Sequence, residues 1–397
     1  MPIRIRELIR IRTCCLRIGM ALPPHGLEPV ADWFPVTRTG SVFLAHCSVA
    51  PLPRRVADAI TKQVEAATLG DRPEERAARL DGFRTHAAAL LGAAPDEIAF
   101  VTNTVEGVRL VAAGFRWAPG DNIVGGAIEF PANVYPWMGL RDQGVELRLV
   151  EPRAGRLTVE DVRAACDAHT RMVALSSVQF LSGQRTDVHR IGELCRERGI
   201  RFFVDAIQGL GALAFDVRRI AVDYLSAGGH KWLLGPVGSG VFYCRREAAD
   251  DLGMPFPGHR SMVPRADHLP YAYNVRRDAV RFEAGAMNNA GICGLEASIE
   301  LLGRVGIERI EARVLALTAQ LADGLRSRGY ELLSPQGDAE RSGIVAFHHR
   351  TIDAVGLTVR LRRAGIVVSP MSGWVRCAPH FYNEPQDIEN ALSALVL

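Results

Sequence analysis

Residues 204–236 read VDAIQGLGALAFDVRRIAVDYLSAGGHKWLLGP, and the interpretation of the whole chain starts from this stretch. Asp205 closes an apolar run that predicts a buried strand, and Gln208 follows three residues later. His230 and Lys231 come after two glycines, which let a backbone approach a bulky ligand. Because ligands meet the carboxyl ends of strands in an open α/β sheet, we expect these side chains to form one binding site.

Lys231 stands out because this chain hardly uses lysine. Its one other lysine is Lys62, and the remaining 45 basic residues are arginine. Arginine stays protonated and cannot act as an amine nucleophile, so a lysine kept beside a predicted strand end indicates covalent chemistry. Lys62 lies on a predicted exposed helix face, where chance retention is the simpler explanation.

An amine and a carboxylate in this order match the needs of one cofactor, pyridoxal 5'-phosphate (PLP). The amine forms a Schiff base with the cofactor aldehyde, and a carboxylate beside the pyridinium nitrogen keeps the ring protonated, so that the ring accepts electrons. PLP also needs a phosphate anchor. In the segment VTNTVEGV, Thr104 stands where a helix begins, so backbone N–H groups and the helix dipole can hold an anion. Each feature alone is common for structural reasons, but together they predict a PLP site.

Predicted helices and strands alternate from about residue 52 onward. Apolar runs at 97–101, 171–178 and 200–206 are separated by amphipathic segments such as 73–91 and 187–199. Strands of this kind are buried on both faces, so the pattern predicts an α/β protein with a mainly parallel sheet covered by helices.

The predicted helices and strands become shorter after residue 329, and this pattern predicts a small α+β C-terminal domain. We expect a small domain formed by 21–50 and 329–397, and a large cofactor-binding domain over 51–328. In residues 1–20, arginines alternate with Ile and Leu, without the apolar core or cleavage site of a secretory signal. We interpret them as an N-terminal extension, with targeting or membrane-surface binding as the alternative.

These motifs resemble the class V aminotransferase-fold family of PLP enzymes over about residues 40–397. The matching segments are DAIQ at 205–208, GGHKW at 228–232, TVEGVRLVA, EFPANVYPW and RFEAGAMNN. The family includes cysteine desulfurases, selenocysteine lyases, kynureninases and isopenicillin N epimerase-like proteins. The resemblance implies a fold type I PLP enzyme whose large α/β domain has a mainly parallel seven-stranded sheet. It also implies a homodimer with active sites at the interface.

The resemblance assigns roles to individual residues. Lys231 would be the Schiff-base lysine, Asp205 the partner of the ring nitrogen, and Gln208 the hydrogen-bond donor to the ring hydroxyl. Arg376 would bind the substrate carboxylate. The residues that would hold the phosphate are Thr104, Val105 through its N–H, and His230.

Phe130 departs from the family pattern, and two further positions leave alternatives open. Phe130 stands where desulfurases carry a stacking His, so we expect an aromatic face over the ring that cannot transfer protons. Ala286 stands where the family commonly lends a Thr to the neighbouring subunit's phosphate. Asn288 or Asn289 would replace that hydrogen bond, and a helix-start Asn is the alternative. His46 is a candidate substrate contact or acid, with a core or capping His as the alternative.

The C-terminal domain discriminates between reactions. By resemblance, desulfurases carry a mobile loop with a nucleophilic Cys ahead of the carboxylate-binding Arg. Here only SPMSG, residues 369–373, joins the two predicted strands before Arg376. Cys377 follows Arg376 directly, so on a strand its side chain points to the opposite face, and we interpret it as a buried structural Cys.

Cys-less members of the resembled family often act as C–S lyases on S-conjugated cysteines. We therefore expect a PLP-dependent C–S β-lyase that cleaves an S-substituted cysteine through an external aldimine and an aminoacrylate, in secondary or thiol metabolism. The alternatives are an epimerase, an aminotransferase or a decarboxylation-coupled oxidative deaminase of the same fold. A non-enzymatic binding module is disfavoured because Lys231 is kept. The polar and aromatic loop at 253–280 would either bind a sugar or acidic conjugate or face the dimer partner.

Composition excludes several other classes of protein. The chain has 397 residues, 48% of them apolar and 23% charged, which fits a globular protein of about two domains. Its 47 basic and 44 acidic residues are too evenly balanced for a nucleic-acid binder, and no apolar run is long enough to span a membrane. The eight cysteines show no metal-ligand spacing, so we expect no metal site and a reduced, cytoplasmic protein.

Overall fold

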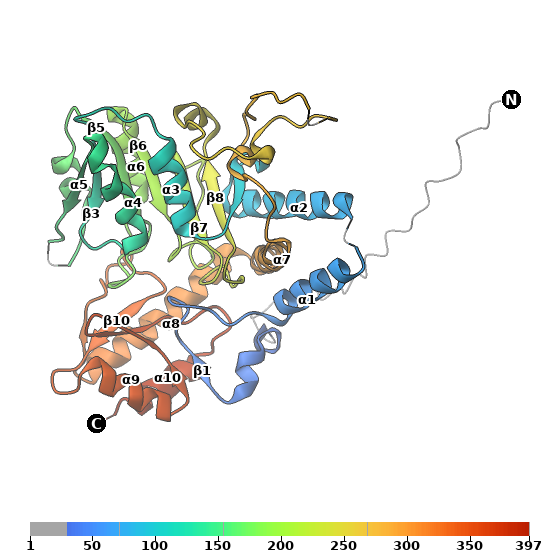
Figure 1. The fold of residues 1–397 in the computed structure, drawn as a ribbon. Helices are drawn as coiled ribbons and strands as arrows, with labels where there is room; N and C mark the ends of the chain where they lie inside the picture. The colour runs from blue at the N-terminus through green and yellow to red at the C-terminus, as the bar shows by residue number, and fades with distance from the viewer. Residues whose placement is uncertain (1–29, 71, 154, 268, 397) are drawn as a thin grey trace.

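The computed structural model describes residues 30–70, 72–153, 155–267 and 269–396, so the predicted extension at 1–20 lies outside the described residues. Within this part of the chain, a seven-stranded sheet with the order β2-β8-β7-β6-β5-β3-β4 forms the centre (Figure 1). Strand β8 is antiparallel to both of its neighbours, and the other adjacent pairs are parallel. The strands are β2 (Ile98–Val101), β3 (Asn122–Gly126), β4 (Glu146–Val150), β5 (Thr170–Ser176), β6 (Arg201–Asp205), β7 (Tyr224–Gly228) and β8 (Gly240–Cys244).

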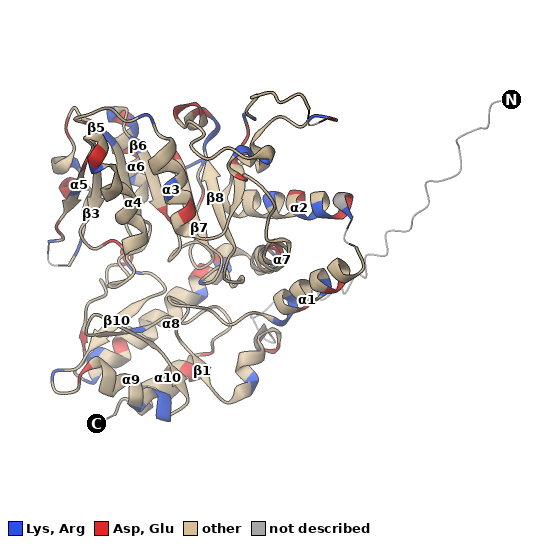
Figure 2. Cartoon of the chain, viewed as in Figure 1, with Lys and Arg blue, Asp and Glu red and all other residues tan. Residues whose placement is uncertain are grey.

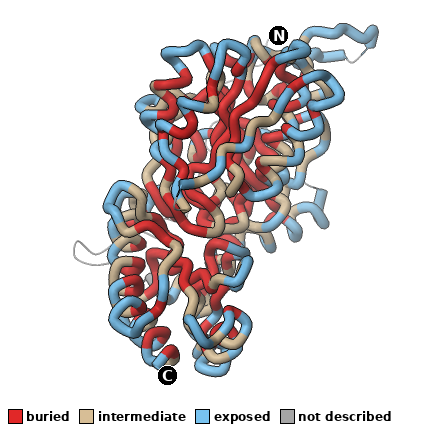
Figure 3. Tube along the Cα trace, turned by 90° about the vertical axis from the view of Figure 1, so that its left-hand side faces the viewer, coloured by how far each residue is buried: buried red, intermediate tan, exposed pale blue. Residues whose placement is uncertain are grey.

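Helices cover both faces of this sheet, because its central strands are apolar on both sides. In β6, Phe202 and Val204 belong to one buried cluster, whereas Phe203 belongs to the cluster on the opposite face. Figure 3 shows buried chain, in red, filling the interior of the larger part of the molecule. The predicted α/β class with a mainly parallel seven-stranded sheet is confirmed. The helices of this part are α1 (Arg54–Thr68), α2 (Pro73–Leu91), α3 (Thr104–Gly114), α4 (Tyr135–Met138), α5 (Val159–Ala165), α6 (Val188–Arg198) and α7 (Asn289–Val305).

The C-terminal part forms a smaller antiparallel sheet with the order β12-β13-β10-β9. The N-terminal strand β1 (Val42–Phe43) pairs in parallel with β11 (Ile366–Val367), so the start of the described chain lies with its end. The other elements are α8 (Ile307–Ser327), β9 (Glu331–Leu332), β10 (Val345–His348), α9 (Ala354–Arg363), β12 (Ser369–Met371), β13 (Trp374–Cys377) and α10 (Pro385–Ala394).

Helix α8 connects the two parts, because it contributes to both hydrophobic cores. Ile310 and Val314 pack in the core of the large sheet, whereas Leu317 and Leu321 pack in the core around the small sheet. The predicted domain boundary at residue 328 falls at the end of this helix, and the division itself stays a prediction.

The sequence pattern also predicts helices over 131–144 and 290–328, and both are broken in the structure. The segment 131–144 forms a 3-10 turn, the single turn α4 and a second 3-10 turn, because Pro136 lacks an N–H donor and Gly139 and Gly144 interrupt the helix. The segment 290–328 divides into α7 and α8 at Gly306, whose φ of +90° is a conformation that favours glycine.

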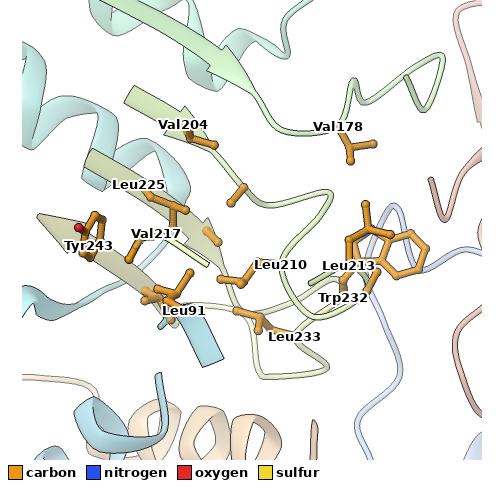
Figure 4. Close-up of a cluster of buried hydrophobic side chains, with 14 of the residues drawn as sticks. Leu91, Val178, Val204, Leu210, Leu213, Val217, Leu225, Trp232, Leu233 and Tyr243 are labelled. Atoms are coloured by element: carbon orange, nitrogen blue, oxygen red, sulfur yellow. The ribbon is translucent and has the colours of Figure 1, made fainter. Parts of the chain in front are cut away.

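The loops that follow β6 and β7 pack against each other through apolar side chains. Leu210 and Leu213, which follow β6, lie close to Trp232 and Leu233, which follow β7 (Figure 4). All four side chains are almost completely buried. This packing fixes the backbone on either side of the predicted site residues.

Charged residues of both signs are interspersed over the elements instead of forming one basic or acidic face (Figure 2). Among the described residues, no helix combines the length and the apolar character needed to cross a membrane.

Replacing Gly211 with alanine tests this packing. Gly211 has φ of +101°, and an added Cβ would overlap the carbonyl group of Trp232. We expect a loss of at least about 2 kcal/mol in the free energy of unfolding, measured by urea denaturation. Gly199→Ala is the matched control, because Gly199 also has a positive φ of +67° but open space around it. A control loss equal to that of Gly211→Ala would contradict the packing argument.

Candidate active site

Strands β5, β6 and β7 end at the same edge of the large sheet, and the predicted site residues gather there. Asp205, the last residue of β6, is in register with Ser176 on β5 and Ser226 on β7. Lys231 follows the end of β7 by three residues. Parallel strands thus bring the carboxylate and the amine to one edge, as the sequence predicts.

Burial controls the charge of both groups. Asp205 is 2% exposed, and burial raises its pKa to about 7, with a further contribution from the nearby Glu129 carboxylate. Burial also lowers the pKa of Lys231, against the opposing influence of Asp205. The Asp205 Oδ1 atom accepts a hydrogen bond from the Ile207 N–H at 2.9 Å, and within the described residues Oδ2 accepts none. A carboxylate of this kind suits a cationic ring nitrogen.

Two partners fix the side-chain amide of Gln208. The Trp232 indole N–H donates to Gln208 Oε1 at 3.0 Å, and Gln208 Nε2 donates to the Cys47 carbonyl at 3.0 Å. These bonds determine which end of the amide carries the donors, and one Nε2 hydrogen stays available for a ligand oxygen. The carbonyl of Trp232 is held in turn by His380 Nε2 at 3.0 Å.

The start of α3 and the end of β7 lie next to each other, as the predicted phosphate site requires. As the first residues of α3, Thr104 and Val105 have N–H groups without an intrahelical acceptor. The Thr104 hydroxyl accepts from the Gly228 N–H at 2.9 Å and keeps its own hydrogen to donate. A Cβ at Gly228 would lie 3.1 Å from the His230 ring, so glycine leaves room for that ring.

Two aromatic rings line the site beside the lysine. Phe130 is 40% exposed, and its ring centroid lies 5.6 Å from Lys231 Nζ. Phe180 meets the Phe130 ring edge-on, with 5.3 Å between the ring centroids. An exposed phenyl face next to the amine can cover an aromatic cofactor ring, but it carries no group that transfers a proton.

Arg376 reaches the site from β13 in the small sheet. Its Nη1 donates to the Phe180 carbonyl at 2.6 Å, and its Nη2 donates to Ser369 Oγ at 2.7 Å. Its buried Nε has no partner among the described residues. Because a guanidinium has five N–H donors, three remain available for a carboxylate. Cys377, the next residue, packs in the core of the small sheet.

Two further candidates, His46 and Asn288, have contacts that give them a role in the fold instead of in binding. His46 is fully buried, with Nδ1 2.7 Å from the Ala378 carbonyl and Nε2 2.9 Å from the Tyr382 hydroxyl. Burial, with a contribution from His380, places its pKa well below the ordinary value, which favours the alternative of a neutral core histidine.

Asn288 caps α7, because its side chain accepts from the Gly291 N–H at 2.9 Å. This geometry favours the helix-start alternative for Asn288. Asn289 is half-buried and borders two surface hollows, and its predicted role toward the phosphate stays a prediction.

Sequence reasoning missed Glu129 and Trp232, which surround the predicted residues. Glu129 is buried in the segment after β3 and accepts four hydrogen bonds. A charged residue that directly follows the apolar run 122–128 is a signal that could have identified it. The contact between Trp232 and Gln208 has no such signal, because it depends on how two loops fold back on each other.

Together, these residues fit PLP. Asp205 would face the ring nitrogen, Gln208 the ring hydroxyl, and Lys231 the aldehyde carbon. Thr104, Val105 and His230 would hold the phosphate. The observation that carries the fit is a buried carboxylate, one oxygen of which accepts no hydrogen bond among the described residues. It lies at the same sheet edge as the half-buried Lys231 and as the end of β7, which is bonded to Thr104 of α3.

Comparison with known proteins agrees with this geometry. The family model for aminotransferase class-V matches residues 42–387. A probable cysteine desulfurase from Methanothermobacter thermautotrophicus is 31% identical over 376 residues, which cover 88% of this chain and 92% of that protein. The apo structure of a cysteine desulfurase from Thermococcus onnurineus has a TM-score of 0.85 at 26% identity, covering 94% of this chain and 97% of that one.

A likeness of fold extends to the cystine C–S lyase C-DES in complex with its product cysteine persulfide. The TM-score is 0.84 at 22% identity, and the match covers 90% of this chain and 97% of that one. The match to the aminotransferase class-V family confirms the predicted cofactor, PLP.

The raised pKa of Asp205 predicts a pH-dependent stability of the apoenzyme. In the folded apoenzyme the carboxyl keeps its proton up to about pH 7, whereas in the unfolded chain it ionises near pH 4. Between these values the folded state binds the extra proton, so stability falls as pH rises. Asp205→Asn removes this term, and its stability relative to wild type should therefore rise from pH 4 to pH 7. Urea unfolding of both apoproteins across this range measures the difference, and a constant difference would contradict the burial argument.

The two lysines provide a matched test of cofactor attachment. We expect Lys231→Ala to lose the visible absorption band of lysine-bound PLP, because no other amine follows β7. Lys62→Ala should keep the band, since Lys62 is exposed to solvent on helix α1. Absorption spectra of the purified, dialysed variants decide the matter. Retention of the band in Lys231→Ala would assign the cofactor to another amine.

Proposed function

The chain belongs to the aminotransferase class-V family, and from this premise we propose that it is a PLP-dependent C–S β-lyase acting on an S-substituted cysteine. The overall reaction consumes the amino acid and one water, and it yields a thiol, pyruvate and ammonia. The C–S bond breaks and the sulfur leaves with its electron pair as a thiolate, which then takes up a proton.

The turn between β12 and β13 is the observation that carries this proposal. Met371 pairs directly with Trp374, so only Ser372 and Gly373 lie between the strands. Their φ angles of +49° and +82° are those of a tight two-residue hairpin. Such a turn has no room for a loop bearing a nucleophilic cysteine, which a desulfurase of this family uses to receive sulfur.

The described cysteines also favour a lyase. Each of them is buried, and burial raises the pKa of several of their thiols, including Cys47 and Cys377. Because the thiolate is the nucleophile, these side chains are poor sulfur acceptors. A lyase needs none, since it releases the sulfur in a small thiol.

Arg376 would orient the substrate by its carboxylate. Its remaining N–H donors can bind two carboxylate oxygens, and the bonds to Phe180 and Ser369 hold the guanidinium in place. Since Arg376 comes from β13 and Phe180 from the segment after β5, substrate binding would depend on contact between the small and the large sheet.

Lys231 would move the proton. When bound, PLP supplies an electron sink for negative charge at the substrate α-carbon. The lowered pKa of Lys231 favours the neutral form of Nζ, which can take the α-proton. Phe130 offers no second proton carrier on its side of the site, so Lys231 would act as the main base. The buried Asp205 carboxylate would keep the ring nitrogen protonated.

The relatives support the reaction class from two directions. The probable cysteine desulfurase from Methanothermobacter thermautotrophicus indicates a sulfur-bearing amino acid as the type of substrate. The cystine C–S lyase C-DES has the same fold, so this architecture is compatible with β-elimination. We also infer that the protein is a homodimer and that it acts in the cytoplasm. We place the loop at 253–280 near the partner, since Tyr271 and Tyr273 in this loop are exposed in the single chain.

Product analysis tests the proposal. Holoenzyme is mixed in deuterated water with S-alkyl, S-glycosyl and sulfoxide conjugates of cysteine, and the products are identified by mass spectrometry. We expect a thiol or sulfenate together with pyruvate. Recovered substrate with deuterium at the α-carbon and no cleavage would overturn the lyase and favour an epimerase or aminotransferase. An S-substituted acetaldehyde would instead indicate decarboxylation-coupled oxidative deamination.

A further inference from the structure

We propose that Glu129 is a positioning residue that holds the two aromatic walls of the site and, through the Phe180 carbonyl, the guanidinium of Arg376. This inference rests on the proposed function, in which Arg376 binds the substrate carboxylate. It explains how the groups that face this carboxylate and the cofactor ring would be kept in position. It assigns no contact between Glu129 and the substrate.

The Glu129 carboxylate is saturated with hydrogen-bond donors. Its Oε1 accepts from the Ser176 N–H and from Gln179 Nε2, each at 2.8 Å. Its Oε2 accepts from Ser176 Oγ and from Asn133 Nδ2, the latter at 3.0 Å. The residue is 6% exposed, and within the described chain it forms no ion pair with a basic side chain. Four neutral donors therefore replace water around a buried carboxylate.

Two of these donors, Asn133 and Gln179, belong to the segments that carry Phe130 and Phe180. Phe130 directly follows Glu129, and the Asn133 N–H donates to the Phe130 carbonyl at 2.8 Å. Gln179 directly precedes Phe180. The carboxylate thus joins the turn that carries Phe130 to the segment that carries Phe180, and the two rings meet edge-on at 5.3 Å.

The same contacts extend to the groups that would do the chemistry. Phe130 lies 5.6 Å from Lys231 Nζ, and the Phe180 carbonyl accepts from Arg376 Nη1 at 2.6 Å. A shift of the Phe180 backbone would therefore move the acceptor that orients Arg376. A shift of the Phe130 turn would move the ring surface beside the lysine.

Charge gives Glu129 a second effect on the site. Its carboxylate is close enough to Asp205 to raise the pKa of that residue, in addition to the larger effect of burial. Negative charge at this place also favours a protonated cofactor ring nitrogen. Asparagine or glutamine at position 129 would remove this effect along with the hydrogen-bond pattern.

Glu129→Gln is the direct test. One carboxylate oxygen becomes an amide nitrogen that can only donate, so whichever way the amide turns, the nitrogen meets at least one existing N–H donor. We expect the dissociation constant for PLP, titrated into the apoenzyme, to rise by about tenfold, the loss typical of a charged hydrogen bond. The circular dichroism induced in the visible band should weaken, and half-saturation by S-methyl-L-cysteine, followed by the change in that band, should move to higher concentration.

Asp161→Asn is the matched control. Asp161 is a buried carboxylate that accepts from Thr158 at the start of α5 and pairs with Arg153, and among the described residues no hydrogen bond or ion pair joins it to the site residues. We expect it to lose stability without any change in PLP affinity or induced circular dichroism. These measurements read binding and not cleavage, so they keep their meaning if the lyase reaction is wrong.

Gln179→Ala covers the case in which Glu129→Gln fails to fold. It removes one donor next to Phe180 and leaves the carboxylate in place, so the same changes should appear at smaller size. Should a folded Glu129→Gln keep all three quantities within twofold of wild type, the positioning role would be refuted. The same holds if Glu129→Gln does not fold and Gln179→Ala leaves the three quantities unchanged.

Discussion

Burial of the Asp205 carboxylate is the constraint on which the rest of the site depends. A carboxylate at the end of an apolar strand, with a single backbone donor, either keeps a proton or faces a cation. The fold maintains this costly arrangement because helices cover both faces of the sheet and exclude water. The nearby amine of Lys231 is destabilised in its charged form by the same burial. A cofactor with an aldehyde and a basic ring nitrogen satisfies both groups at once.

Segments far apart in the chain have to meet for this site to form. Trp232 links the loop after β7 to Gln208 and to His380 of the C-terminal part. Arg376 enters from the small sheet and is held by the Phe180 carbonyl of the large one. Glycine at positions 211 and 343 leaves space for Trp232, which packs against both. The junction between the two sheets is therefore part of the site as well as of the core.

Much of this arrangement could be predicted from sequence, for identifiable physical reasons. The signals that predict the fold class and the cofactor are local ones. They are the apolar strand runs, the glycines next to Lys231, and the order of Asp205 and Gln208. The prediction of one helix over 131–144 was wrong, because Pro136 and two glycines interrupt the helix that the apolar pattern favours. The partners of His46 and Glu129 could not be predicted, because hydrogen bonds between distant segments leave no pattern in a single sequence.

The products formed from L-cysteine, whose sulfur carries a hydrogen in place of the proposed S-substituent, test the central claim most directly. The account predicts sulfide, pyruvate and ammonia, with an intact protein mass that gains no sulfur, because the hairpin turn at Ser372 and Gly373 leaves no loop to carry a receiving thiol. L-Alanine as the product, together with a protein mass increased by one sulfur atom, would contradict the account and place the chain with the persulfide-forming desulfurases.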